Sequence, residues 1–173
     1  MSYFTDLFTV ETYEAFLASD RSRSGFRETQ TGIAERVSRG DKLLAYIKGL
    51  SRWAAVLEVV GGPNVERTPL FLPDNDPYVV RFRVRPLAAL PLEQAIPIRD
   101  EKVFATLSFT RGKEDGYWLG PLRRSLQHID DSDGRFLEDE LLNQSKTPTP
   151  YPLDEAAAAA SAIAMQGQPL RAL

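Results

Sequence analysis

The sequence predicts an α+β fold: a mixed, mostly antiparallel, barrel-like β-sheet with helices packed outside it, over residues 1–143. Residues 78–87 alternate between apolar and cationic side chains, the period of a strand with one buried face. Residues 42–47 and 53–60 are two apolar runs joined by a short polar turn, as in a β-hairpin. Two amphipathic segments, 9–19 and 131–143, have the apolar spacing of helices.

The chain begins with a predicted strand and helix. Residues 2–8 are rich in aromatic and β-favouring side chains, which indicates the first strand. Thr9 is placed to cap the helix that follows. Three large apolar residues share one face of this helix: Tyr13, Phe16 and Leu17. This face is predicted to enter the core.

The next elements are shorter. Residues 20–32 are polar, basic and contain glycine, so they predict a loop, and residues 33–40 predict a short helix that ends at Gly40. The hairpin follows, with Gly49 in its turn. Gly61, Gly62 and Pro63 are expected to end its second strand.

The second half continues the sheet. The alternating strand places Val80, Phe82 and Val84 on one face and Arg81, Arg83 and Arg85 on the other. A row of this kind is most often a solvated sheet face, with a surface that tracks a nucleic-acid backbone as the alternative. The remaining segments predict an extended stretch broken by prolines (90–98), a helical turn entering a loop (102–112), a turn and closing strand (115–129), and the last helix (131–143). Ser132 is expected to cap that helix, with Phe136, Leu137 and Leu141 on its inner face.

From Gln144 the composition changes. Residues 144–173 are rich in proline and alanine with little apolar bulk, so they predict a linker or tail. An alanine run forms helix readily but contributes little core. This segment is either a tail or a link to an effector domain or partner, and the sequence leaves both alternatives open.

Composition narrows the function classes. The chain has 173 residues, a formal net charge of −3, no cysteine, and one histidine, His128. These counts argue against disulfides, thiolate chemistry, catalytic triads and histidine-rich metal sites. No stretch approaches the ~20 apolar residues of a spanning helix, so we expect no membrane partner and a cytoplasmic location. Nucleic-acid contact requires a local basic patch, because the overall charge is not basic.

Three stretches resemble EVE domains, of the PUA-like superfamily that also contains the YTH domains. Residues 24–46 (SGFRETQTGIAERVSRGDKLLAY) resemble the family's aromatic-Gly-x-Arg loop, short helix, Gly-Asp and strand ending in tyrosine. Residues 50–59 (LSRWAAVLEV) are similar to the strand that runs past the family's pocket. The third stretch joins DPYVVRFRVRPL, LSFTRG and WLGPLRRSLQHIDDSDGRFLEDEL, in the order of the family's later half.

This resemblance implies a PUA-like fold and a reader of nucleic acid, not an enzyme, which flips a modified base into an aromatic pocket. Methylated or hydroxymethylated bases are the expected ligands, on DNA in preference to RNA, with no cofactor and no metal. EVE-type modules often accompany restriction and other defence effectors. The sequence departs from the family at one wall of the pocket, where it has Gly25-Phe26 in place of the usual Trp-Gly.

A flipped base needs flat walls, polar groups on its edge and cations for its phosphates. The candidates for the base pocket are Phe26, Tyr46, Ser51, Trp53, Ser108, Phe109, Thr110 and Trp118. The candidates for phosphate contacts are Arg27, Arg52, Arg111, Lys113, Arg123 and Arg124.

Each large ring also has a purely structural interpretation. Trp53, at the start of the hairpin's second strand, either plugs the barrel or forms a pocket wall, and Tyr46 fits a core position better. Phe26 lies in a polar loop, which favours the pocket. In the hypothesis of a hairpin rim, Ser51 binds the base edge, Arg52 a phosphate and Trp53 the base.

Motifs of other protein classes match the sequence less well. Pro73-Asp74 and Asp100–Lys102 imitate the acidic pair and lysine of a metal-dependent nuclease, but a proline and a helical turn surround the second half. The DDSDG stretch imitates a calcium loop but would put Ile129 at a position that requires a carboxylate. The alternative from another class is a protein-interaction or scaffold domain whose rings are all core.

Overall fold

The computed structural model describes residues 1–113 and 120–153. Its strands are β1 (Tyr3–Phe8), β2 (Arg23–Phe26), β3 (Lys42–Ile47), β4 (Arg52–Val65), β5 (Val80–Ala89), β6 (Ile96–Pro97) and β7 (His128–Ile129). Its α-helices are α1 (Val10–Ala18), α2 (Thr31–Ala34), α3 (Glu101–Thr106) and α4 (Asp131–Lys146). Short 3-10 turns are η1 (Glu28–Gln30), η2 (Leu92–Gln94) and η3 (Gly120–Leu122).

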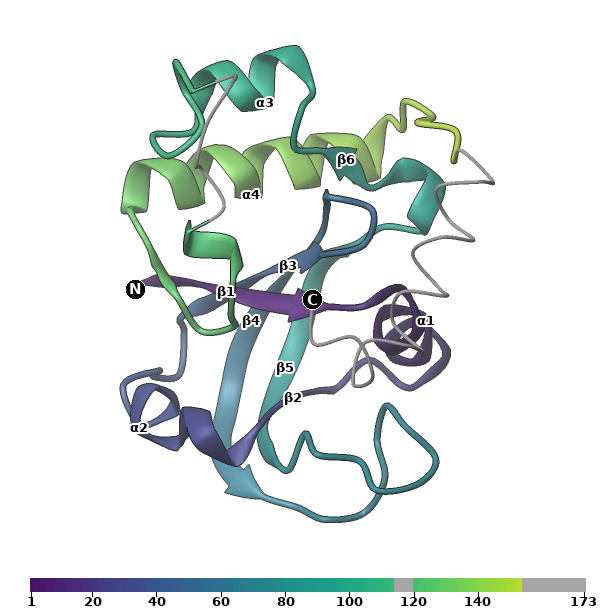
Figure 1. Ribbon diagram of the computed structural model, residues 1–173, viewed down its shortest axis with the longest axis vertical. Coiled ribbons are helices and arrows are strands. Elements are labelled where there is room, and N and C mark those ends of the chain that lie inside the picture. The colour runs from purple at the N-terminus through teal and green to yellow at the C-terminus, as the bar shows by residue number, and fades with distance from the viewer. Residues whose placement is uncertain (114–119, 154–173) are drawn as a thin grey trace.

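The strands form one curved sheet in the order β2-β5-β4-β3-β1-β7, with β6 paired to β4 (Figure 1). β1 pairs with β3 in parallel, whereas the other pairs between the described strands are antiparallel. The predicted fold class, a mostly antiparallel barrel-like sheet with flanking helices, is therefore confirmed.

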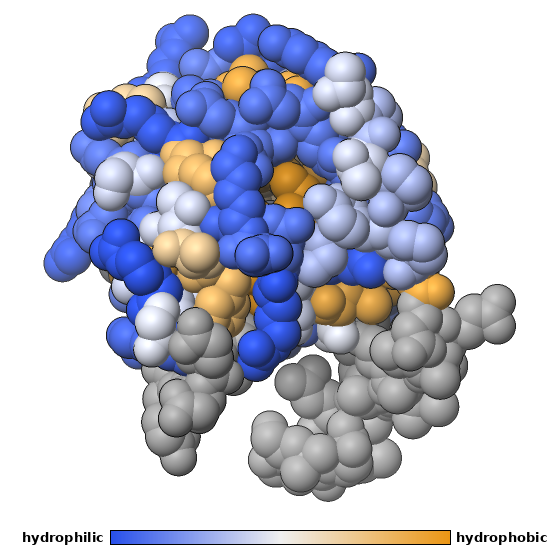
Figure 2. Space-filling view, turned by 90° about the horizontal axis from the view of Figure 1, so that it is seen from above, coloured by the Kyte–Doolittle hydropathy of each residue, from blue (hydrophilic) through white to orange (hydrophobic). Residues whose placement is uncertain are grey.

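Both faces of the sheet are buried. Alternate side chains of β3 enter two different cores: Leu43, Ala45 and Ile47 enter the first, and Leu44 and Tyr46 the second. α1 and the segment around α2 contribute to the first core, which fills the barrel, while α3 and α4 cover the second. Over α3 and α4 the outer surface is mainly hydrophilic, with small separate apolar patches (Figure 2).

β2 and β7 are the two ends of the sheet, and side-chain contacts across the seam between β1 and β2 join β2 and η1 to β1 and to the segment before β7. The Ser24 hydroxyl of β2 donates to the Asp6 carboxylate of β1. The Gln30 side-chain amide donates to the carbonyl oxygen of Ser125, at 2.9 Å. Among the described residues, side-chain contacts and not strand pairing thus link β2 to β1.

Capping places α1 as predicted. The Thr9 hydroxyl accepts from the Thr12 backbone N–H, and the Thr12 hydroxyl accepts from the Thr9 N–H. Tyr13 and Phe16 are fully buried, and the Tyr13 hydroxyl donates to the Leu90 carbonyl at 2.7 Å. Burial accordingly raises the pKa of Tyr13.

Several predicted boundaries differ from the structure. Residues 23–26 form strand β2, not loop, because they pair with β5 along Arg23–Arg83 to Phe26–Val80 despite a polar composition. β4 continues through Gly61–Pro63 to Val65, since bulges in its pairing with β5 absorb the glycines. Helix occupies residues 31–34 and not 33–40.

The arginine row also divides. Arg83 and Arg85 are exposed, and Arg85 pairs with Glu58. Arg81 is only 3% exposed, because residues 66–79, between β4 and β5, fold over it. We call these residues the β4–β5 loop.

The C-terminal helix extends past its predicted end. α4 runs to Lys146, and its N-terminal residue is Asp131 with Asp130, not Ser132, at the N-cap. Beyond it, the Tyr151 N–H donates to the Glu93 carbonyl at 2.7 Å, and Gln144 binds the backbone of Thr149. The linker expected from residue 144 thus starts with packed residues, and the boundary at 143 stays a prediction.

No described helix is both long enough and apolar enough to cross a membrane.

Candidate functional site

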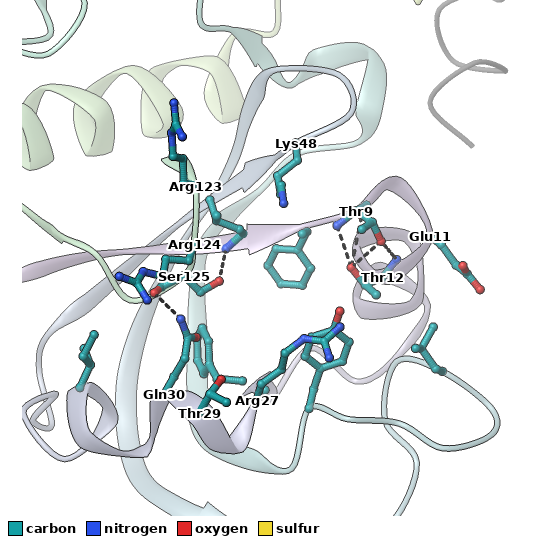
Figure 3. Close-up of a pocket in the computed structure, with 17 residues that line it drawn as sticks. Thr9, Glu11, Thr12, Arg27, Thr29, Gln30, Lys48, Arg123, Arg124 and Ser125 are labelled. Atoms are coloured by element: carbon teal, nitrogen blue, oxygen red, sulfur yellow. Dashed lines mark hydrogen bonds between the residues drawn. The ribbon is translucent and has the colours of Figure 1, made fainter. Parts of the chain in front are cut away.

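A cleft of about 760 Å³ opens at the seam between β1 and β2 (Figure 3). This volume lies within the range of about 300–1,000 Å³ that is usual for small-molecule sites. Five segments line it: the end of β1 with the start of α1, the end of β2 with η1 and α2, Lys48 after β3, the β4–β5 loop, and residues 123–125. The cleft therefore depends on parts of the chain that are far apart in sequence.

Three aromatic rings line the cleft: Phe8, Phe26 and Tyr78. Phe8 ends β1 and Phe26 ends β2, and both are almost completely buried. Tyr78 is half-buried and lies two residues before Val80, the pairing partner of Phe26. Of the three, Tyr78 can present a flat surface to a planar heterocycle, because Phe8 and Phe26 are almost completely buried.

The polar groups of the cleft come mainly from its edges. Thr9 and Thr12 form the cap of α1, and the Gln30 side-chain amide donates to the Ser125 carbonyl oxygen at one side of the cleft (Figure 3). The Ser125 hydroxyl accepts from the Leu7 N–H at 2.8 Å. These hydrogen bonds hold the edge of the cleft in a fixed conformation.

The cleft is locally basic although the chain is acidic overall. Four basic side chains and one carboxylate, Glu11, line it. Arg123, Arg124 and Lys48 lie on one side, and Arg27 on the other (Figure 3). Within residues 1–113 and 120–153, none of these four cations has an acidic partner at ion-pair distance. The site is therefore suited to an anionic ligand.

A buried carboxyl group, that of Asp6, lies on the same strand face as one of the aromatic rings of the cleft. Asp6 and Ser24 precede Phe8 and Phe26 by two residues, so each shares a strand face with one of the rings. Asp6 is only 1% exposed. Burial raises its pKa to about 7, against the lowering effect of the Ser24 hydrogen bond.

The structure brings four of the predicted site residues together at this cleft: Phe26, Arg27, Arg123 and Arg124. The Arg27 guanidinium lies 5.2 Å from the centre of the Tyr78 ring. Phe26 lies at a strand end and not in the loop expected for it.

Tyr46 and Trp53 require a correction. Their rings pack edge to face at 4.9 Å in the core under α3 and α4, and Trp53 has no exposed surface. They face away from the first core because neighbouring residues of a strand point to opposite faces. The two rings touch each other and are closed to solvent, so in this structure they pack as core residues and do not form the predicted hairpin rim.

Ser51 and Arg52 have structural roles at the same turn. The Ser51 carbonyl accepts from Ile98 N–H at 2.9 Å, and Ser51 adopts a positive φ of 54°. Arg52 donates to the carbonyl oxygens of Leu92, Tyr151 and Pro152. Partial burial lowers the Arg52 pKa. Its guanidinium is thus occupied by backbone oxygens.

The predicted residues around α3 lie outside the cleft. Ser108 donates through its backbone and hydroxyl to Asp133, and Thr110, fully buried, donates to the Phe104 carbonyl at 2.7 Å. Phe109 packs on the second core. Arg111 and Lys113 are exposed in the following turn. Trp118 lies outside the described residues.

The metal-site alternatives gain no support from the geometry. The Asp100 carboxylate accepts from the Val103 N–H and caps α3. Asp133, from the acidic stretch, is bound to Ser108. Among the residues that the structure describes, no three acidic, histidine or cysteine side chains are grouped to hold a metal ion.

Phe8, Tyr78 and Lys48 line the cleft but were not predicted. Phe8 belongs to a strand with ordinary alternation, and Tyr78 begins a stretch where the arginine row dominates the pattern. The available signal was positional: all three lie at the end of a strand or beside one.

No family model and no curated protein matches the chain by sequence. Solved YTH domains share its fold. The Pho92 YTH domain in complex with m6A superposes with a TM-score of 0.59 and 17% identity, covering 84% of this chain and 86% of that one. The Mmi1 YTH domain complex with RNA gives 0.58 and 11%, covering 88% and 84%. The YTH domain of Zygosaccharomyces rouxii MRB1 with N6-methyladenosine RNA gives 0.50 and 14%, covering 86% and 90%. The fold of this chain is therefore YTH-like.

Proposed function

We propose that the protein is a nucleic-acid reader that accepts one flipped, modified base in the cleft between β1 and β2. The observation that carries the proposal is the combination, at a single opening, of an aromatic lining with four basic side chains that have no acidic partner at ion-pair distance among the described residues. The solved YTH domains with a similar fold are in complex with RNA or m6A. These neighbours support a reader module and not an enzyme.

The division of labour follows from the chemistry of the groups. Base–aromatic stacking contributes about 1–3 kcal/mol per base, so Tyr78, the half-buried ring of the three, would supply most of the base affinity. A methyl group adds roughly 0.8 kcal/mol on burial, which a close fit can convert into preference for a modified base. Arg27, Arg123 and Arg124 would bind flanking phosphates, which position the strand without reading its sequence.

The finer assignments belong to the same proposal. An EVE-type module, DNA as the strand, and a restriction or defence setting stay predictions from the resemblance. The complexes of YTH domains with RNA make RNA the direct competitor of DNA. A cytoplasmic location is likewise a prediction.

The test measures binding of the full chain to single-stranded oligonucleotides by fluorescence anisotropy. Matched DNA and RNA strands carry N6-methyladenine, 5-methylcytosine, 5-hydroxymethylcytosine or no modification. We expect one modified strand to bind best. Tyr78→Ala should weaken it by about 5- to 150-fold, while Tyr78→Phe retains the ring and the affinity.

Salt dependence separates phosphate contacts from base contacts. Arg123→Ala and Arg124→Ala should each reduce the slope of log K against log salt by about 0.7, the value per phosphate for single strands. Arg135→Ala, on the exposed side of α4, is the matched control and should leave the slope unchanged. Absence of binding to every strand would favour the scaffold alternative and reject the reader.

A further inference from the structure

The β4–β5 loop contributes Leu72 and Tyr78 to the cleft without containing a helix or strand of its own. One carboxylate organises it. Asp76 accepts four backbone N–H groups: from Leu70 at 2.8 Å, Phe71 at 2.7 Å, Leu72 at 3.4 Å and Tyr78 at 2.8 Å. Burial by itself would raise the Asp76 pKa, but these four donors outweigh it and lower the pKa.

A buried arginine holds the same loop from below. Arg81 Nε donates to the Tyr78 carbonyl at 2.9 Å, and its Nη2 donates to the Thr68 carbonyl. Arg81 Nη2 is also 3.9 Å from the Asp76 carboxylate, and both side chains are almost inaccessible to solvent. Asp76 therefore binds the N–H of Tyr78 while Arg81 binds its C=O, so the peptide groups on both sides of Tyr78 are fixed.

The position of the Tyr78 backbone is also restricted by its close contact with β2. A Cβ atom at Gly25 would lie 2.7 Å from the Tyr78 carbonyl oxygen and 3.0 Å from the Tyr78 Cβ. The Tyr78 ring lies beneath the Arg27 guanidinium and meets Phe71 at 6.1 Å. The backbone of Tyr78 thus approaches β2 as closely as a glycine allows.

From this geometry we infer that Asp76 and Arg81 are positioning residues for the cleft, which hold Tyr78 where a base would stack. The inference rests on the proposed function for its ligand. Two buried charges are costly to desolvate, and a buried pair is often no more stabilising than apolar side chains of the same size. If Asp76 and Arg81 set the conformation of Tyr78, which borders the cleft, the two buried charges have a function other than stabilising the fold.

The experiment compares Asp76→Asn with Asp41→Asn in the full chain. Asp41 is the matched control because it is also buried and accepts two backbone N–H groups, from Ser2 and Ser38, each at 2.8 Å, away from the cleft. An asparagine keeps the size but weakens the acceptors in both. Urea unfolding measures the stability of each variant, amide hydrogen exchange follows residues 70–78, and anisotropy follows the best-bound modified strand.

We expect Asp76→Asn to accelerate exchange at Leu70, Phe71 and Tyr78 and to raise Kd by a factor approaching that of Tyr78→Ala. Asp41→Asn should lower stability at unchanged Kd. Unchanged exchange at these amides, or wild-type affinity, in Asp76→Asn would overturn the inference. If wild-type protein binds no strand, the proposed function fails, while the exchange data still decide whether Asp76 positions the wall.

Arg81→Lys keeps the test decisive if Asp76→Asn does not fold. Lysine retains the charge but lacks the guanidinium fork, so it cannot reproduce the pair of contacts to Tyr78 and Thr68. It should weaken binding of the modified strand and leave the far-ultraviolet circular dichroism spectrum unchanged. Wild-type affinity in this variant would contradict the positioning role.

Discussion

Replacing Asp6 by asparagine should remove a pH dependence of stability that is built into the barrel. The Asp6 carboxyl is buried between β1 and β2, with the Ser24 hydroxyl as its hydrogen-bond donor. Burial disfavours the charged form, so the pKa of Asp6 rises from 3.8 to about 7. Asparagine has nearly the same shape and no charge to desolvate.

The sign of the effect follows from proton linkage. Between pH 3.8 and about 7, the folded protein holds a proton on Asp6 that the unfolded chain has released. The free energy of unfolding therefore falls by about 1.4 kcal/mol per pH unit in this window and levels off above it. Over the whole window the loss is about 4 kcal/mol, a large part of the 5–15 kcal/mol typical of a domain.

Urea unfolding from pH 4 to pH 8 measures this effect, with the intrinsic tryptophan fluorescence of the protein as the signal. Asp6→Asn should resemble wild type near pH 4 and become more stable than wild type as the pH rises, by up to about 4 kcal/mol above pH 7. Asp74→Asn, at an exposed aspartate, controls for the change of residue type.

A stability difference between Asp6→Asn and wild type that stays constant from pH 4 to pH 8 would refute the reasoning. It would mean that Asp6 is solvated in the folded protein. Ser24→Ala provides a second check. Losing the Ser24 hydrogen bond should raise the pKa of Asp6 further, so the free energy of unfolding should continue to fall above pH 7.

Three further predictions concern the core and the C-terminal segment. Trp53→Ala should cost about 3–5 kcal/mol of unfolding free energy, measured in urea, and an unchanged midpoint would contradict its core position. Arg52→Ala should expose residues 147–153 to limited proteolysis at a faster rate, since it removes the contacts to Tyr151 and Pro152, and an unchanged cleavage rate would count against this clamp. Gly134→Ala should lower the thermal midpoint although alanine favours helix, because its Cβ would overlap the Tyr3 ring, and a raised midpoint would show that the ring can move.

Local sequence signals predicted much of the fold. The alternation of residues 78–87, the hairpin and the Thr9 cap depend on neighbouring residues, and the corresponding elements are present. β2 was missed because its four residues have little strand propensity and become a strand only by pairing with β5. Arg81 was assigned to a solvated face, since its burial depends on the β4–β5 loop folding over it.

The sequence by itself indicated most of the strands, the Thr9 cap and the cations, and it named Phe26, Arg27, Arg123 and Arg124, which line the cleft. Only the tertiary structure decided that Trp53 packs inside while Tyr78 borders an opening. The physical reason is that both faces of this sheet are buried, so alternation separates the two faces without telling which one meets a cleft. That choice depends on where the sheet fails to close, which is set by contacts between distant segments.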